Sequence, residues 1–217
     1  MTYTGKVRPG GRPDVHELPG LSITKFSVGE MDNNVYLLRC QATDEQLLVD
    51  AADDADRILQ VVGPDGLTTV VTTHQHWDHH RALQEVVSAT GAATVAGAED
   101  ADALPVPVDR RVGDGDVVEV GSCRLEVIHL TGHTPGSIAL LYDDPEGAPH
   151  VFTGDSLFPG GVGKTSTEAD FASLLHDVSV KLFDRLPDET WLYPGHGADS
   201  TLGAERPHLS EWRARGW

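Results

Sequence analysis

The amino-acid sequence predicts an α/β protein in which two β-sheets pack against each other and helices cover their outer faces. Three observations lead to this expectation. Each half of the chain contains short apolar or alternating segments that suit strands, each half also contains helical segments, and no linker-like stretch separates the two halves. The 217 residues, 39% of them hydrophobic, are enough for one domain with a sizeable core.

The first half of the chain contains five of the expected strands. Residues 1–20 carry several Gly and Pro residues and little periodicity, so we expect an irregular N-terminal arm before a single domain over 21–217. Strands are expected over 21–28, 35–40, 47–49, 68–73 and 94–96. Helices are expected over 53–62, where Gly63 and Pro64 end the periodicity, and from about 78 to Gly91.

The second half repeats this organisation. Strands are expected over 117–120, 124–130, 137–142, 151–153 and 190–193, and the first two form a hairpin through Gly121 and Ser122. A helix is expected over 170–186, because its apolar residues recur on one face. A polar tail that contains Trp212 and Trp217 is expected to close the chain.

The charge balance limits the classes of partner. Thirty-four acidic against sixteen basic residues give a formal charge of −18, which argues against nucleic acids and anionic membranes as partners. No apolar run approaches the roughly 20 residues that span a bilayer, and no signal peptide is recognisable. Cys40 and Cys123 lack a CxxC partner, as is typical of core thiols in a reducing compartment. We expect a cytoplasmic protein, a monomer or homodimer.

The strand expected over 68–73 runs directly into the segment HQHWDH, residues 74–79. Side chains two positions apart in extended chain point to the same side, so His74 and His76 can converge on one ion. The turn into the following helix re-aims Asp78 and His79 toward a neighbouring point. Imidazole and carboxylate ligands together suit zinc, and also iron or manganese. The segment therefore predicts a metal site.

Three later segments share one pattern, an apolar strand followed by a metal-type residue beside glycine. They are VIHLTGH, HVFTGD and WLYPGH, which end at His133, Asp155 and His196. Glycine allows the backbone to approach closely, and strand ends hold side chains rigidly. A shared site requires all four segments to meet at one edge of the sheets.

The ordered motifs HxHxDH, GHTPGS, TGDSLF and PGH resemble those of the metallo-β-lactamase superfamily, and most of all its glyoxalase II branch of thioester hydrolases. The resemblance extends from residue 21 to about residue 196. It implies an α/β fold that is a four-layer αββα sandwich, with two mixed β-sheets flanked by helices. It also implies two divalent metal ions, with zinc expected first and iron or manganese as the other options.

The resemblance assigns roles to individual positions. The implied ligands are His74, His76 and His133 for one metal, Asp78, His79 and His196 for the other, and Asp155 as a bridge. Asp50 matches an aspartate that supports a ligand from behind. Lys164 matches a position that in glyoxalase II relatives reaches a carboxylate of the substrate.

The implied reaction is hydrolysis by a hydroxide that bridges the two ions, which coordination makes available near pH 7. Asp78 would orient this hydroxide and take up its proton. Because thiols have a pKa of about 8.5, a thiolate leaves without a dedicated general acid, and this favours a small-molecule thioester over an amide.

Two features depart from the glyoxalase II pattern. The segment after His196 is too short for the C-terminal helical domain with which those relatives grip glutathione, and Ser166 or a polar neighbour stands near the position of a family tyrosine. The thiol carrier, or a different ester as substrate, therefore stays open.

Three other functions are weighed against the thioester hydrolase. A persulfide dioxygenase-like enzyme with one iron would use two histidines with Asp155, but the complete second set (Asp78, His79, His196) argues against it. Lactonase chemistry is a further enzyme option. A non-catalytic binding module is the least expected, because such relatives commonly lose ligands and no ligand is lost here.

Overall fold

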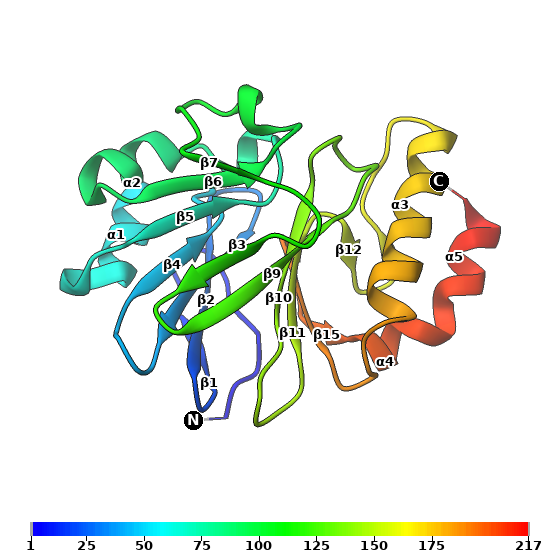
Figure 1. Ribbon diagram of the computed structural model, residues 1–217, viewed down its shortest axis with the longest axis horizontal. Helices are drawn as coiled ribbons and strands as arrows, with labels where there is room; N and C mark the ends of the chain where they lie inside the picture. Colours follow the sequence, from blue (N-terminus) through cyan, green and yellow to red (C-terminus); the bar gives the residue numbers. More distant parts are fainter. Residues whose placement is uncertain (1, 217) are drawn as a thin grey trace.

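The computed structural model describes residues 2–216 and places two mixed β-sheets between two layers of helices (Figure 1). Helices α1 (Ala55–Val62) and α2 (Leu83–Thr90) lie on the outer side of the first sheet. Helices α3 (Glu168–Asp177), α4 (Leu202–Glu205) and α5 (Leu209–Arg215) lie on the outer side of the second. The expected four-layer α/β arrangement is confirmed.

The first sheet has seven strands whose order in space is their order along the chain. They are β1 (Asp14–Glu17), β2 (Leu21–Val28), β3 (Asn33–Cys40), β4 (Gln46–Val49), β5 (Thr69–Thr72), β6 (Ala93–Gly97) and β7 (Arg110–Val112). Strands β1 to β4 pair antiparallel, whereas β4 to β7 pair parallel. The parallel strands need crossovers, and α1 and α2 provide two of them.

The second sheet has six strands in the order β15-β14-β11-β10-β9-β8. They are β8 (Val117–Val120), β9 (Cys123–His129), β10 (Ile138–Tyr142), β11 (His150–Gly154), β14 (Trp191–Pro194) and β15 (Ser200–Thr201). A separate two-stranded hairpin joins β12 (Leu157–Phe158) to β13 (Gly161–Val162). Strands β11 and β14 pair in parallel, so their carboxyl ends lie side by side.

Three apolar clusters hold the four layers together. The first lies between the sheets and includes Leu38 and Leu140, the second lies between the first sheet and α1 with α2 and includes Ile58, and the third lies under α3 and α5 and includes Leu174. All four of these side chains are fully buried. Burial of such a side chain contributes about 1.5–3 kcal/mol, so the clusters fix the sheets that carry the site.

The N-terminal segment differs from the expected irregular arm. It contains β1, which pairs with β2 in a four-residue register and forms the edge of the first sheet. A strand of four residues flanked by Gly and Pro is difficult to recognise in the sequence. Its side chains alternate between half-buried and exposed positions.

The C-terminal segment also differs from expectation, because it is helical rather than a polar tail. Trp212 on α5 is buried and packs edge-on against Phe183, with ring centroids 6.1 Å apart. Trp217, expected in the same tail, lies outside the described residues, as does Met1. The helices α4 and α5 are too short for their apolar periodicity to be visible in the sequence.

The helix expected over 170–186 is present but changes type. After α3 ends at Asp177, residues Val178–Phe183 continue with π-helical geometry, and the amide of Asp184 donates to the carbonyl of Ser179. The guanidinium of Arg206 donates to the Phe183 carbonyl at the end of this segment. Within residues 2–216, none of the helices is both long enough and apolar enough to cross a membrane.

A buried histidine on β11 gives the fold a predictable acid sensitivity. Burial lowers the pKa of His150 to about 4, and His16 beside it adds to the effect. The unfolded chain binds a proton on this side chain near pH 6.5, whereas the folded chain does so only near pH 4. Stability therefore falls as the pH drops through this window and levels off below it.

We expect this histidine to account for on the order of 2 kcal/mol of the stability lost between pH 7 and pH 4.5. Urea unfolding at the two pH values measures the loss, and His150→Gln, which can still hydrogen-bond to Tyr193, should lose correspondingly less stability than wild type. An equal loss in both proteins would assign the acid sensitivity to other groups.

Candidate metal centre

Four loops bring the expected ligands together. They follow β5 in the first sheet and β9, β11 and β14 in the second, as the shared pattern of the segments required. The donor atoms form three overlapping groups, each within 4.8 Å: His74, His76 and His133; His74, His79 and Asp155; and Asp78, His79 and His196. All seven side chains expected as ligands thus belong to one constellation.

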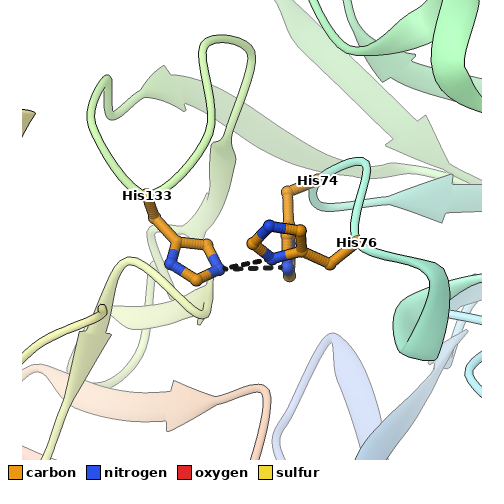
Figure 2. Close-up of side chains that lie close together, drawn as sticks. All are labelled: His74, His76 and His133. Carbon is orange, nitrogen blue, oxygen red and sulfur yellow. Dashed lines mark hydrogen bonds between the residues drawn. The ribbon is translucent and has the colours of Figure 1, made fainter. Parts of the chain in front are cut away.

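The first group consists of three imidazoles (Figure 2). Nε2 of His133 lies 2.9 Å from Nδ1 of His76 and 3.3 Å from Nε2 of His74. The ring of His133 approaches from the loop after β9, opposite the two rings that follow β5. Three nitrogens of this kind converging on one point match the histidine ligands of a divalent metal ion.

The second group lies next to the first. Nε2 of His79 is 3.3 Å from Nε2 of His196, and both nitrogens face Oδ2 of Asp78, at 3.5 and 3.4 Å. A 3₁₀ turn over Trp77–His79 aims Asp78 and His79 at this point, away from the direction of His76. The change from extended chain to a turn is the re-aiming that the sequence predicted.

Asp155 stands between the two groups. Its Oδ1 lies 3.3 Å from Nε2 of His79, and its Oδ2 lies 3.6 Å from His196 and 3.8 Å from His133. Oδ1 is buried and accepts no hydrogen bond from the described residues. A buried carboxylate oxygen without a donor costs free energy, so a cation between the groups would satisfy it.

Glycine is required where β14 reaches the site. A Cβ atom on Gly195 would lie 2.2 Å from Oδ1 of Asp155 and 2.7 Å from Cε1 of His79. Any larger residue would push the loop of His196 away from the other ligands. The glycine before His196 therefore serves the close approach expected from the sequence.

Hydrogen bonds on the outer side of the rings determine which nitrogen faces the site. Nδ1 of His133 donates to the carbonyl of Lys164 at 2.6 Å, and Nδ1 of His196 donates to the carbonyl of Met31 at 3.1 Å. Because a carbonyl only accepts, each ring keeps its proton on Nδ1 and turns the lone pair of Nε2 inward. This is the arrangement that metal-binding histidines need.

Asp50 orients the ring of His79 in the same way, by accepting a hydrogen bond on the outer side of the ring. Its Oδ2 lies 2.8 Å from Nδ1 of His79 and accepts from the Thr73 hydroxyl at 2.8 Å, while its Oδ1 accepts from the Thr73 amide at 2.7 Å. Asp50 is buried and has a φ of 60°, in the left-handed region. The structure thus places Asp50 directly behind a candidate ligand.

The electrostatics of the site favour a cation. Burial holds the pKa of His74 well below its ordinary value, and the neighbouring histidines lower it further. Burial would also lower the pKa of His79, but Asp50 and Asp155 raise it to about 10. A divalent cation satisfies both tendencies, because it supplies the positive charge that the carboxylates attract and uses the lone pairs of the neutral rings. The residues fit a metal pair.

The loop that carries His196 is tied to the N-terminal part of the chain. Nζ of Lys25, which is fully buried, donates to the carbonyl of Gly197 at 2.9 Å and to Oδ1 of Asp199 at 2.6 Å. The hydroxyl of Tyr3 donates to the other oxygen of Asp199 at 2.5 Å. These buried contacts position the last of the seven side chains.

Two residues that help to build the site were not expected from the sequence. Nδ2 of Asn33, on β3, donates to Oδ2 of Asp78 at 3.0 Å. Asp100 is buried and accepts from the amides of Gln75 and Gly136, at 2.9 and 2.7 Å, which ties the loop after β5 to the loop after β9. Neither lies in a motif, and only the contacts reveal them.

Lys164 reaches the site through its backbone. Its carbonyl accepts from His133, whereas its side chain is exposed and does not line the cavity beside His76 and His133. Binding of the substrate by the side chain of Lys164 stays a prediction. His80, adjacent to His79 in the chain, is bonded instead to the carbonyl of Gln75 at 3.0 Å.

A family model described as the metallo-beta-lactamase superfamily matches residues 28–196, the span that holds all seven side chains. The chain belongs to this superfamily. Among curated members, a hydroxyacylglutathione hydrolase from Rhodospirillum rubrum is 33% identical over 185 residues, which cover 84% of this chain and 66% of the relative. The chain spans 58–66% of the length of such relatives.

Solved structures of the superfamily share the fold. ETHE1 from Myxococcus xanthus is 30% identical with a TM-score of 0.75, covering 88% of this chain and 84% of that one. The BLEG-1 B3 metallo-beta-lactamase has a TM-score of 0.78 at 23% identity, covering 88% of this chain and 99% of the other. At 23% identity, the similarity to the BLEG-1 lactamase shows a shared fold and nothing more.

Proposed function

We propose that this protein is a hydrolase that uses two divalent metal ions to cleave a small-molecule thioester. The observation that carries the proposal is the position of Asp155 between two groups of candidate ligands, one of three imidazoles and one of two imidazoles and a carboxylate. The similarity to hydroxyacylglutathione hydrolases supports the thioester as substrate class.

The proposal assigns each group of candidate ligands to one metal ion. His74, His76 and His133 would hold one ion and Asp78, His79 and His196 the other, with Asp155 available to both. Imidazole and carboxylate ligands suit zinc, which we expect ahead of iron or manganese. Bound ions of this kind lower the pKa of water and polarise a carbonyl group.

The side chains of the protein supply the positioning and the proton transfer. Asn33 donates to Oδ2 of Asp78, the oxygen that faces His79 and His196, and so holds the carboxylate where it can accept a proton from the attacking water. The hydrogen bonds behind His79, His133 and His196 keep the rings in place during the reaction. A thiolate can leave without being protonated, so the proposed reaction requires no general acid besides these residues.

Metal analysis combined with a substrate panel tests this proposal. We expect about two divalent ions per chain, hydrolysis of thioesters such as S-lactoylglutathione in preference to lactones, and loss of activity on chelation that added metal reverses. One iron per chain with oxygen uptake on a persulfide would point to a mononuclear dioxygenase instead. A preference for lactones would replace the thioester, and absence of both metal and turnover would support a binding module.

A further inference from the structure

A cavity of about 450 Å³ opens directly beside the first group of histidines. The residues that line it include His76 and His133, and also Gln75, Thr131, Ser166 and Asp170. Because the cavity borders two candidate ligands, any substrate whose carbonyl reaches the metal centre can extend a neighbouring group into it. The thiol carrier is the bulkier part of a small thioester, and this space can accommodate it.

Asp170 is held firmly at this cavity. It lies in the first turn of α3, where Thr167 caps the helix and its hydroxyl donates to Oδ2 of Asp170 at 2.8 Å. The same turn packs against the loop of His133, since a Cβ atom on Gly132 would lie 2.3 Å from the backbone oxygen of Asp170. The carboxylate therefore has a defined place relative to the candidate ligands.

The lining of the cavity is polar but carries no positive side chain. Apart from the histidines, Asp170 is the one titratable residue among the described residues that line it, and no Lys or Arg within the described chain pairs with it. The side-chain amide of Gln75 and the hydroxyl of Ser166 make no hydrogen bond to other described residues. Both groups are free to bind hydroxyl or amide groups of a ligand.

We propose that this cavity binds the thiol carrier of the substrate and that Asp170 selects a carrier with neutral, hydroxyl-bearing groups over one that ends in a carboxylate. The inference rests on the proposed thioester hydrolysis. A carboxylate beside Asp170 would meet a like charge, and no Lys or Arg is among the described residues that line the cavity, whereas the first expected ion would lie at His76 and His133. The formal charge of −18 adds to the repulsion. Hydroxyl groups would instead donate to Asp170 and exchange hydrogen bonds with Gln75 and Ser166.

The test uses three thioesters that differ only at the end of the carrier: S-lactoylglutathione, its glycine amide, and the amide that its glycine forms with glucosamine. Like charges about 5 Å apart near a protein surface repel enough to change affinity roughly five-fold or more. For the metal-loaded wild type, kcat/KM should therefore be roughly five-fold or more higher for the glucosamine amide than for the acid, mainly through KM.

Asp170→Asn should reduce this preference to about one, because it removes the charge and keeps an oxygen for the helix cap. Glu168→Gln is the matched control. Glu168 lies in the same first turn and is exposed away from the cavity, so its substitution removes the same charge and should leave the preference unchanged. Thermal melting of both variants shows whether the helix cap has survived.

The outcomes separate this inference from the proposed function. Turnover of the acid as good as that of the amides, or a preference that Asp170→Asn leaves intact, would overturn the inference. So would Lys164→Ala if it raised KM for the acid alone, because the carboxylate would then be bound by that lysine. Failure of the metal-loaded protein to hydrolyse any of the three, together with failure on every other thioester of the wider panel, would refute the thioester hydrolase itself.

Discussion

Replacement of Asp78 by alanine is expected to lower kcat for thioester hydrolysis on the order of 10³-fold and to leave the fold intact. The side chain faces His79 and His196 at 3.5 and 3.4 Å, and Asn33 holds one of its oxygens. Its loss removes both a proton acceptor for the attacking water and a ligand of the second ion. Initial rates and metal content, measured on the same preparation, test the expectation.

The two roles of Asp78 can be separated. Asp78→Asn keeps an oxygen that can bind a cation but cannot take a proton at neutral pH, so it should retain metal better than Asp78→Ala while turnover stays low. Glu85→Ala, an exposed acidic residue on α2, serves as control and should have nearly wild-type rates. More than a tenth of wild-type activity in Asp78→Ala would contradict the assigned role.

Replacement of Asp50 by alanine is expected to destabilise the metal-free protein by on the order of 3–5 kcal/mol. The carboxylate is the acceptor for the amide and hydroxyl of Thr73 and for Nδ1 of His79, all buried. Removal leaves three donors without a partner, and alanine tolerates the φ of 60° less well than aspartate. Urea unfolding in chelator gives the stability.

Loss of Asp50 should also weaken metal binding about 10- to 100-fold, because His79 loses the group that orients its ring. Asp44→Ala is the matched control: Asp44 has a φ of 62° but is exposed, so the substitution has the same backbone cost without the buried donors. Competition with a coloured chelator measures the affinity. If the two variants were equally stable and bound metal equally well, the supporting role of Asp50 would be wrong.

The sequence predicted the parts of the fold whose residues form a long enough pattern. The β-branched run that became β5 and the alternating run that became β2 were recognised, as was the helix that starts near Asp170. β1, α4 and α5 were missed because each has only four to seven residues. Such elements form through packing against an existing sheet, which no local pattern displays.

In the candidate site, too, the sequence predicted the residues that belong to a local pattern and missed those whose roles depend on tertiary contacts. The seven expected side chains converge because each follows a strand whose end the sequence marks with glycine, histidine or aspartate. Asn33 and Asp100 could not be found in this way, because their roles arise from contacts with loops 45 and 25 residues away in the chain. The direction of Lys164 is likewise a matter of tertiary packing, and its carbonyl rather than its side chain meets His133.

The buried contact between Lys25 and Asp199 has a consequence for how the site forms during folding. It joins residues 174 positions apart, and contacts of such separation form slowly because a large loop must close first. The loop of His196 can reach its final place only when both ends of the chain have met. The position of His196, and with it the second group of ligands, therefore depends on a contact between the two ends of the chain.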